Sequence, residues 1–329
     1  MEVARLPWTH AYGPRRAADL LLNSLRPNTQ KVYNTYIHKW KCYTRLNNID
    51  SLSPSEVEVA NFLAHMFDQG DSYSSVNAAR SALSTFIPST NKATIGSSRE
   101  VCRLVKGVFE ARPALPKHTN TWSVDSVLDY MCSLPEIADL TLKQLTLRTV
   151  MLLALLTGQR GHALHLLKIG DIRMHHNKCV IVFSSKHKQT KPGAHTEPAE
   201  ISAFTQNPKI CLVGHLHAYL KQTEPLRKGQ ELLISFNKLH APVARGTFSR
   251  WVKTMLAAAG VDTVHYGPHT TRAASCSAAA NQGASLTSIL KAAGWSSEAT
   301  FTRFYKKTVV DNPAFGHSVL RSFVQKHGI

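Results

Sequence analysis

A polar segment with two prolines divides this chain into two blocks of helical periodicity. It runs from Arg112 to Asn120, contains Pro113 and Pro116, and shows no apolar repeat. Because proline fixes φ and lacks a backbone donor, such a stretch is typical of a linker between domains. At 329 residues the chain can form two domains that each bury a core. We expect a helical domain over residues 1–113, a linker over 114–120 and a larger domain over 121–329.

Four amphipathic helices are predicted in the first block. Apolar residues recur there at helical spacing, serines stand where helices can begin, and Pro88 can end one of them. The helices are predicted at residues 29–43, after a cap at Ser53 or Ser55, from Ser74 to Pro88, and at residues 98–110. Taken alone, an ordinary helical bundle with a solvated, charged surface is the simpler interpretation of this block.

The second block is predicted to be mainly α-helical with one small antiparallel sheet. Residues 178–183 and 199–204 have the composition of strands, and the lysine-rich residues 184–195 between them can form a hairpin turn. Helices are expected around it at residues 124–133, 141–156, 209–221, 247–259, 271–282, 286–293, 297–305 and 314–325.

The charge balance indicates a polyanionic partner. Lys and Arg number 39 against 21 Asp and Glu, a formal net charge of +18. Double-stranded DNA is the first candidate, because phosphate contacts to such a surface release counterions. A membrane surface is the weaker alternative, because the sequence has no long amphipathic Lys/Arg helix and no dense polybasic cluster beside a hydrophobic anchor. The longest apolar run, residues 150–156, is too short to span a bilayer. Six scattered cysteines favour a reduced intracellular protein, and a nuclear address would suit a eukaryotic DNA enzyme.

Three short motifs contain candidate chemistry. The first, Thr157-Gly-Gln-Arg160, closes an apolar helix. An arginine held there can present its guanidinium fork to a phosphate, although a surface arginine that complements the helix dipole is the simpler interpretation. The second, Gly267-Pro-His269-Thr-Thr-Arg272, can begin a helix and direct His269 and Arg272 to one anion. A chance basic pair is the alternative.

The third motif is Ala293-Gly-Trp295, followed ten residues later by Tyr305. Gly294 suits a sharp helix end. Trp295 can donate its indole N–H to a phosphate oxygen, but packing in the core is the default interpretation for a tryptophan. None of the three motifs is decisive by itself.

The order of these motifs resembles the tyrosine recombinase (phage integrase) family. An arginine, a lysine-bearing hairpin, His-x-x-Arg, Gly-Trp and a tyrosine follow one another over residues 153–307. The sequence AGWSSEATFTRFY is most similar to recombinases of DIRS-type retrotransposons and Crypton-like elements, or to genes domesticated from them. The chain departs from the family pattern in two places. Ala163 stands where an acidic residue is usual, and the gap from Trp295 to Tyr305 is one residue longer than common.

The resemblance implies a catalytic set and a metal-free, cofactor-free reaction. Tyr305 would form a 3'-phosphotyrosyl bond with DNA, and nearby cations would favour its deprotonation, because a phenol with a pKa of ~10 is a poor nucleophile at neutral pH. The implied roles are Arg160 and Arg272 as the phosphate clamp, His269 in proton transfer, Trp295 in the place of a family His or Trp, and Lys188 as the hairpin lysine, with Lys186 or Lys191 as alternatives.

The resemblance also implies how the protein meets DNA. A helical core-binding (SAM-like) domain and the catalytic domain would form a C-shaped clamp, acting as a homotetramer that exchanges the helix at 314–325 between protomers; this helix could instead dock on its own domain. The candidate DNA contacts are Lys31, Lys39, Arg80, Lys106, Lys186 and Lys191, each of which could equally be merely solvated.

Three other functions remain open at this point. A type IB topoisomerase would share the chemistry but relax supercoils as a monomer. A domesticated DNA-binding protein would bind without cutting, although the complete set of Arg160, His269, Arg272 and Tyr305 argues against it. A helical scaffold that binds no DNA is hard to reconcile with the charge of +18.

Overall fold

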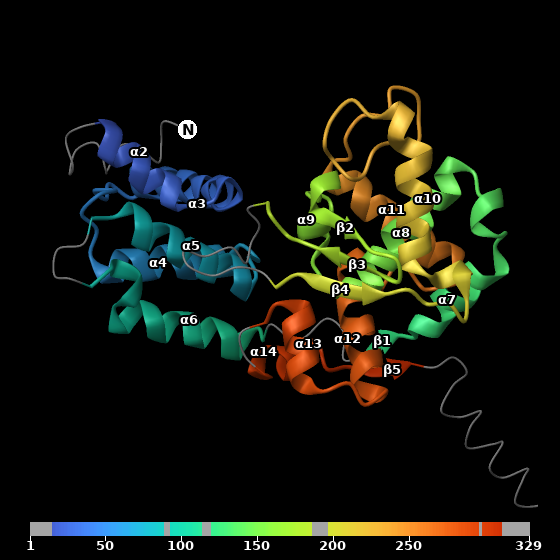
Figure 1. The fold of residues 1–329 in the computed structure, drawn as a ribbon. Helices are drawn as coiled ribbons and strands as arrows, with labels where there is room; N and C mark the ends of the chain where they lie inside the picture. The colour runs from blue at the N-terminus through green and yellow to red at the C-terminus, as the bar shows by residue number, and fades with distance from the viewer. Residues whose placement is uncertain (1–14, 89–92, 114–119, 186–196, 296–297, 311–329) are drawn as a thin grey trace, which may run out of the picture. The chain divides into compact units, whose positions relative to one another are not determined.

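The computed structural model describes residues 15–88, 93–113, 120–185, 197–295 and 298–310 (Figure 1). The chain divides into two compact units, Met1–Lys117 and His118–Ile329. Each unit has a hydrophobic core of its own. The predicted fold class, mainly helical with a small antiparallel sheet, is confirmed.

The N-terminal unit is a bundle of helices. The four predicted helices are confirmed as α3 to α6, and a further helix, α2, precedes them. Their bounds are α2 (Arg15–Ser24), α3 (Pro27–Leu46), α4 (Glu56–Asp68), α5 (Tyr73–Phe86) and α6 (Arg99–Ala111), with a 3-10 turn η1 (Ile95–Ser97).

Local sequence signals determine where these helices begin. Ser55, not Ser53, caps α4: its hydroxyl accepts a hydrogen bond from the Glu58 amide at 3.3 Å, and the Glu58 carboxylate accepts one from the Ser55 amide at 2.7 Å. This reciprocal capping box satisfies two amides that the helix itself leaves unpaired. Behind the caps, Trp40 is fully buried and packs edge-on against Phe62 with ring centroids 5.1 Å apart.

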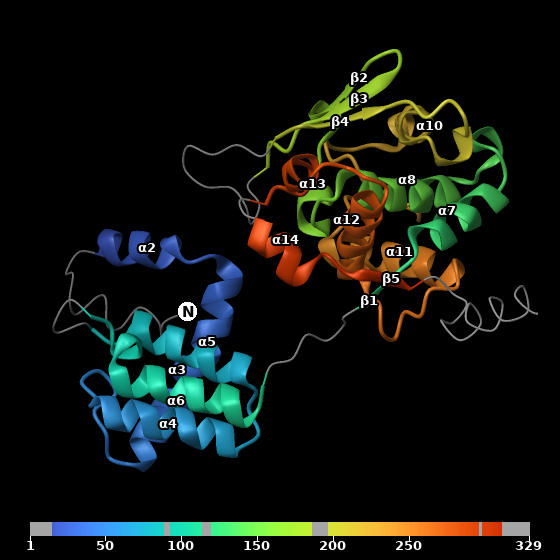
Figure 2. The same cartoon turned by 90° about the horizontal axis from the view of Figure 1, so that it is seen from below.

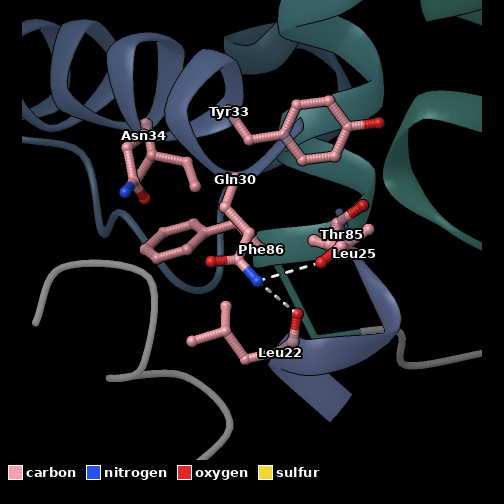
Figure 3. A pocket seen from close by; sticks show the side chains of 8 residues that line it. Leu22, Leu25, Gln30, Tyr33, Asn34, Thr85 and Phe86 are labelled. Atoms are coloured by element: carbon pink, nitrogen blue, oxygen red, sulfur yellow. Dashed lines mark hydrogen bonds between the residues drawn. The ribbon is translucent and has the colours of Figure 1, made fainter. Parts of the chain in front are cut away.

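Helix α2 was not predicted, and a tertiary contact holds it. The Gln30 side chain on α3 donates hydrogen bonds to the carbonyl oxygens of Leu22 at 2.8 Å and Leu25 at 2.9 Å (Figure 3). Leu22 and Phe86 line a small pocket beside this anchor. The ten residues of α2 are too few for a stable isolated helix, so their helicity depends on this contact more than on local periodicity.

The C-terminal unit is built around one buried helix, α8 (Leu142–Thr157). Nearly every α8 residue after Gln144 is buried, and the helix contacts α10, α11 and α12. In Figure 2 the three-stranded sheet lies on one side of α8, and α11 and α12 on the other. The other helices are α7 (Val124–Ser133), α9 (Gly161–Leu164), α10 (Leu212–Thr223), α11 (Arg245–Ala258), α12 (Thr271–Asn281), α13 (Leu286–Ala293) and α14 (Glu298–Phe304), with 3-10 turns η2 (Ile137–Asp139), η3 (Ile169–Asp171), η4 (Pro208–Ile210), η5 (Glu224–Leu226) and η6 (Pro268–Thr270).

The predicted hairpin is confirmed, but it belongs to a three-stranded sheet. Strands β2 (Ile172–Met174), β3 (Lys178–Ile181) and β4 (Ala199–Ser202) pair antiparallel in that order. Lys178 lies opposite Ser202 in the register, and their neighbours Cys179 and Ile201 follow. Helix α10 begins at Leu212 and not near residue 209, because Pro208 opens the short turn η4 before it.

The prediction of a single sheet is wrong. Strand β1 (Asn120–Trp122) pairs in parallel with β5 (Thr308–Val310), so the start of the C-terminal unit lies beside its last described residues. Figure 1 shows the two strands side by side next to α12. Three residues are too few to show an alternating pattern, which is why the sequence carried no signal for this pair.

The predicted helix at residues 314–325 lies outside the described residues. No helix in the described ranges has both the length and the apolar character needed to cross a bilayer.

Candidate functional site

Arg160 is placed by a sharp turn after α8. Gly158 ends the helix in the left-handed conformation, with φ of 58°, which glycine adopts without steric cost. Arg160 follows at the N-cap of α9 and is half-buried. Its Nη1 atom is buried and has no hydrogen-bond partner among the described residues.

Gln159 has a role that the sequence did not reveal. Its side chain is only 4% exposed, and its Nε2 donates a hydrogen bond to the Ala292 carbonyl oxygen at 2.7 Å. The contact ties the turn that carries Arg160 to the end of α13. The only local signal was its position beside Arg160, since the partner lies 133 residues further along the chain.

Arg272 lies in the first turn of α12, and only 4% of its surface is exposed. Its Nη2 donates a hydrogen bond to the Ala293 carbonyl oxygen at 2.6 Å, while Nε and Nη1 are buried and have no partner in the part of the chain that the structure describes. The last two carbonyl groups of α13 therefore bind Gln159 and Arg272. A cation at a helix C-terminus also interacts favourably with the helix dipole.

Trp295 and Tyr305 stack around the guanidinium of Arg272. Arg272 Cζ lies 4.2 Å from the Trp295 ring centroid and 5.3 Å from the Tyr305 ring centroid. The two aromatic centroids are 4.4 Å apart. Gly294, with φ of 63°, ends α13 and turns the chain so that Trp295 faces this cluster, and Tyr305 follows directly after α14. Three of the predicted catalytic residues thus meet in one place.

Arg160 lies close enough to this cluster for its positive charge to act on Arg272. The pKa of Arg272 is lowered to about 10, first because burial disfavours the charged form and second because the positive charge of Arg160 is close; Tyr305 and Cys276 oppose the shift. In the described part of the chain no carboxylate forms an ion pair with either arginine. Two neighbouring guanidinium groups without a counterion favour a bound anion.

The buried atoms of Arg160, Arg272 and Trp295 that lack a partner within the described residues are all hydrogen-bond donors, whereas the neighbouring Gln159 has an unpartnered acceptor, Oε1. Arg160 Nη1, Arg272 Nε, Arg272 Nη1 and Trp295 Nε1 are buried and unpartnered. A buried donor without an acceptor costs about 1–3 kcal/mol, so four of them in one cluster require an explanation. A phosphate offers several acceptor oxygens and a negative charge, and it matches the fork geometry of arginine. The cluster is therefore a candidate phosphate-binding site that includes a phenol.

His269 lies at the edge of this region. It is exposed in η6, directly before α12, and within the described residues no contact joins its ring to Arg272, Trp295 or Tyr305. Trp122 of β1 holds the η6 turn, because its Nε1 donates a hydrogen bond to Thr270 Oγ1 at 2.9 Å. The three hairpin lysines, Lys186, Lys188 and Lys191, lie outside the described residues.

The four candidate DNA contacts of the N-terminal unit differ in their surroundings. Lys31 on α3 and Lys106 on α6 are exposed. Lys39 is exposed too, but its Nζ lies 2.9 Å from Asp71 Oδ2 in an ion pair. Arg80 is half-buried, and its Nη1 donates a hydrogen bond to the Gly96 carbonyl oxygen at 3.2 Å. Arg80 therefore supports the η1 turn in addition to any contact with a phosphate.

Helix α6 has a basic face that the sequence analysis did not single out. Arg99, Arg103 and Lys106 follow one another at spacings of four and three residues, and all three are exposed. This spacing places them on one side of the helix.

The phage integrase family profile matches residues 125–309, more than half of the chain. None of the curated protein sequences compared with the chain matches it.

Several solved structures have a similar fold. A Tn1549 transposon integrase in complex with transposon right end DNA has a TM-score of 0.60 at 14% identity, over 99% of each chain. The XerH site-specific recombinase bound to palindromic difH substrate has a TM-score of 0.58 at 17% identity, over 91% of this chain and 79% of that one. A lambda integrase dimer bound to a COC' core site has a TM-score of 0.51 at 18% identity, over 93% and 80%.

Proposed function

Because the chain belongs to the phage integrase family, we propose that it is a site-specific DNA recombinase that cuts and rejoins strands through a covalent bond to Tyr305. One observation carries the proposal: four unpartnered donors of Arg160, Arg272 and Trp295 belong to the cluster that contains the Tyr305 ring. This arrangement can hold a phosphodiester and present a nucleophile to it.

The reaction follows from the chemistry of these groups. The Tyr305 hydroxyl attacks the scissile phosphorus, the bond from phosphorus to the 5'-oxygen breaks, and a 3'-phosphotyrosyl bond forms. Arg160 and Arg272 stabilise the charge on the non-bridging oxygens in the pentavalent transition state. A 5'-hydroxyl from another strand then attacks the phosphotyrosyl bond and releases Tyr305. The number of phosphodiester bonds is conserved, so no ATP is needed.

Two proton transfers accompany the cleavage step. The phenol loses a proton as it attacks, and the leaving 5'-oxygen gains one. We assign assistance in proton transfer to His269 and delivery of the proton to the leaving oxygen to a hairpin lysine, with Lys188 as the first choice and Lys186 or Lys191 as alternatives. The proposal needs no metal ion, because cationic side chains supply the charge stabilisation.

Double-stranded DNA is the proposed partner. Lys31, Lys39 and Lys106 are proposed phosphate contacts of the N-terminal unit, to which the face of α6 adds Arg99 and Arg103. Each phosphate contact releases condensed counterions, so binding should weaken steeply as salt rises. Arg80 is a weaker candidate, because its guanidinium already binds the Gly96 carbonyl.

We extend the proposal to assembly and origin. The chain would act as a tetramer on DNA, with the segment at 314–325 exchanged between protomers, and it would serve a mobile element of the DIRS or Crypton type or a gene derived from one. Removal of the residues after Asn312 should abolish assembly on DNA. An unchanged tetramer after this truncation would refute the exchange. That the two units clamp one duplex stays a prediction.

The test is a search for the covalent adduct. The protein is incubated with nicked candidate DNA in EDTA and then denatured; a protein–DNA adduct should survive in the wild type and vanish in Tyr305→Phe. Tyr130→Phe is the matched control, because Tyr130 lies on α7 against the main core and takes no part in the site.

Other outcomes separate the competing functions. DNA binding without an adduct would identify a protein that no longer cuts. An adduct with relaxation of supercoils but without joined recombinant strands would identify a topoisomerase.

A further inference from the structure

Ser277 makes two hydrogen bonds to the backbone beside Tyr305. Its hydroxyl donates to the Tyr305 carbonyl oxygen at 2.9 Å and accepts from the Lys307 amide at 3.1 Å. The side chain is buried, with 1% of the residue exposed. A single hydroxyl therefore fixes the peptide groups on the C-terminal side of the proposed nucleophile.

The segment that Ser277 holds lies between two elements. Helix α14 ends at Phe304 and β5 begins at Thr308. The turn between them is closed on the helix side by the Tyr305 and Lys306 amides, which both donate to the Phe301 carbonyl oxygen at 2.8 Å. Ser277 supplies the contacts on the other side of the turn.

Ser277 and Arg272 are on the same rigid helix. They lie five residues apart on α12, which corresponds to roughly 7.5 Å along the axis. The helix geometry thus determines the spacing between the proposed phosphate clamp and the support of the nucleophile. Reaction rates depend on such spacing, because a misplacement of about 1 Å can cost about 100-fold.

Other contacts around the turn hold the aromatic rings and strand β5. The Tyr305 ring contacts Trp295, and the Phe301 ring contacts Trp295 with centroids 5.6 Å apart. These contacts hold the rings, and the pairing of β5 with β1 holds the chain further on. The backbone between them is held to the helix of Arg272 by the Ser277 hydroxyl.

We infer that Ser277 is a positioning residue that sets the backbone of Tyr305 relative to Arg272 for attack on the phosphate. The inference rests on the proposed function of Tyr305 as the nucleophile. Ser277 acts through Tyr305 and need not touch DNA.

The test compares Ser277→Thr with Ser277→Val, which have the same shape and differ in the hydroxyl. The rate of adduct formation is measured in a single turnover with saturating nicked DNA. The valine variant should be about 30-fold slower than wild type, while the threonine variant should stay within about 3-fold. DNA affinity should be the same for both, because the site of binding is not changed.

A second substrate separates positioning from proton delivery. DNA with sulfur in place of the bridging 5'-oxygen has a leaving group that departs without a proton. If Ser277 positions the nucleophile, the defect of the valine variant persists on this substrate. If the sulfur restores its rate, the inference is overturned, since the defect then lies in leaving-group protonation.

Ser275→Ala is the matched control. Ser275 lies on the same helix, and its hydroxyl donates to the Arg272 carbonyl oxygen within that helix at 3.3 Å. This variant should cleave at the wild-type rate. Equal rates for the threonine and valine variants, with Tyr305→Phe inert, would overturn the inference and leave the proposed function intact. Absence of an adduct in the wild type would instead refute the proposed function.

Discussion

Among the described residues of the C-terminal unit, Arg148 and Arg272 are buried, but they differ in the hydrogen-bond acceptors around their guanidinium groups. Arg148 on α8 is 0% exposed and donates hydrogen bonds to the carbonyl oxygens of Pro135, at 2.8 Å, and Lys209. Burial lowers its pKa, but Cys132 and Glu136 oppose the shift. Arg272 makes one such bond, and its charged neighbour is another arginine.

The difference separates a structural cation, Arg148, from the proposed phosphate-binding cation, Arg272. Both terminal nitrogens of Arg148 have acceptors within the protein, so Arg148 joins α8 to the segments around η2 and η4. Arg272 has two buried nitrogens, Nε and Nη1, without an acceptor among the described residues, whereas Arg148 has one, Nε. Within the described residues the fold supplies no acceptor for these two donors of Arg272, and the proposed function assigns them to a bound phosphate. Five experiments test this contrast.

Replacement of Arg272 should have the largest effect. Arg272→Ala should slow strand cleavage by about 1,000-fold, because it removes donors that stabilise the transition state. Stability should be unchanged or slightly higher, since an uncompensated buried charge is lost. Adduct formation and thermal unfolding measure the two effects. Normal cleavage by Arg272→Ala would show that Arg272 does not serve the reaction, and the proposed difference in role between Arg148 and Arg272 would fall.

Replacement of Arg148 should show the reverse. Arg148→Met should lower the free energy of unfolding by about 3 kcal/mol, because two buried carbonyl groups lose their donors. Cleavage per folded molecule should stay near the wild-type rate. Urea denaturation and active-site titration with nicked DNA give these two quantities. A large loss of cleavage in the folded fraction would show that Arg148 also serves the site.

The region of Arg148 should also respond to pH through His215. Burial and the charge of Arg148 lower the pKa of His215 to about 4, against 6.5 for a free histidine. The unfolded chain therefore binds a proton between pH 6.5 and 4 that the folded chain refuses, and stability falls as pH falls through this window. The loss from His215 should be about 2 kcal/mol between pH 8 and pH 5. His215→Gln should show a correspondingly smaller loss in urea denaturation; an identical pH profile would contradict the assignment.

Replacement of Gln159, which holds the end of α13 beside Arg272, should slow cleavage less than replacement of Arg272 itself. Gln159→Ala removes the hydrogen bond to Ala292 and loosens the end of α13, which also binds Arg272. Cleavage should fall about fivefold, since one hydrogen bond contributes about 1 kcal/mol. Gln159→Glu, which has no N–H to donate, should be at least as slow. If both variants cleave like the wild type, the contact is only structural.

Anion binding should give the smallest effect. Sulfate at about 100 mM should raise the free energy of unfolding by about 1 kcal/mol in the wild type, because an anion that binds only the folded state stabilises it. Arg272→Ala should lose this increment and Arg148→Met should keep it. Chloride at equal ionic strength is the control for general salt effects. An equal increment in all three proteins would argue against a specific anion site.

Much of the helical structure was predictable because its signals are local. Helix α7 has the predicted bounds, with Ser123 as its cap, and α13 ends at the predicted Gly294. The family order of motifs predicted that Arg160, Arg272, Trp295 and Tyr305 would meet. The roles of Gln159 and Ser277 were not predictable, because their partners are backbone atoms 133 and 28 residues away.

The sequence by itself determined the helices, the basic charge and the residue types available for phosphate chemistry. These depend on spacing, capping and composition, all of which can be read along the chain. Only the tertiary structure decided which buried arginine has acceptors for both terminal nitrogens and which one is left with buried donors. The physical reason is that a buried cation is satisfied by whichever acceptors the fold brings to it. For Arg148 these come from positions 13 and 61 residues away, whereas for Arg272 the described part of the fold supplies one carbonyl and leaves Nε and Nη1 without an acceptor.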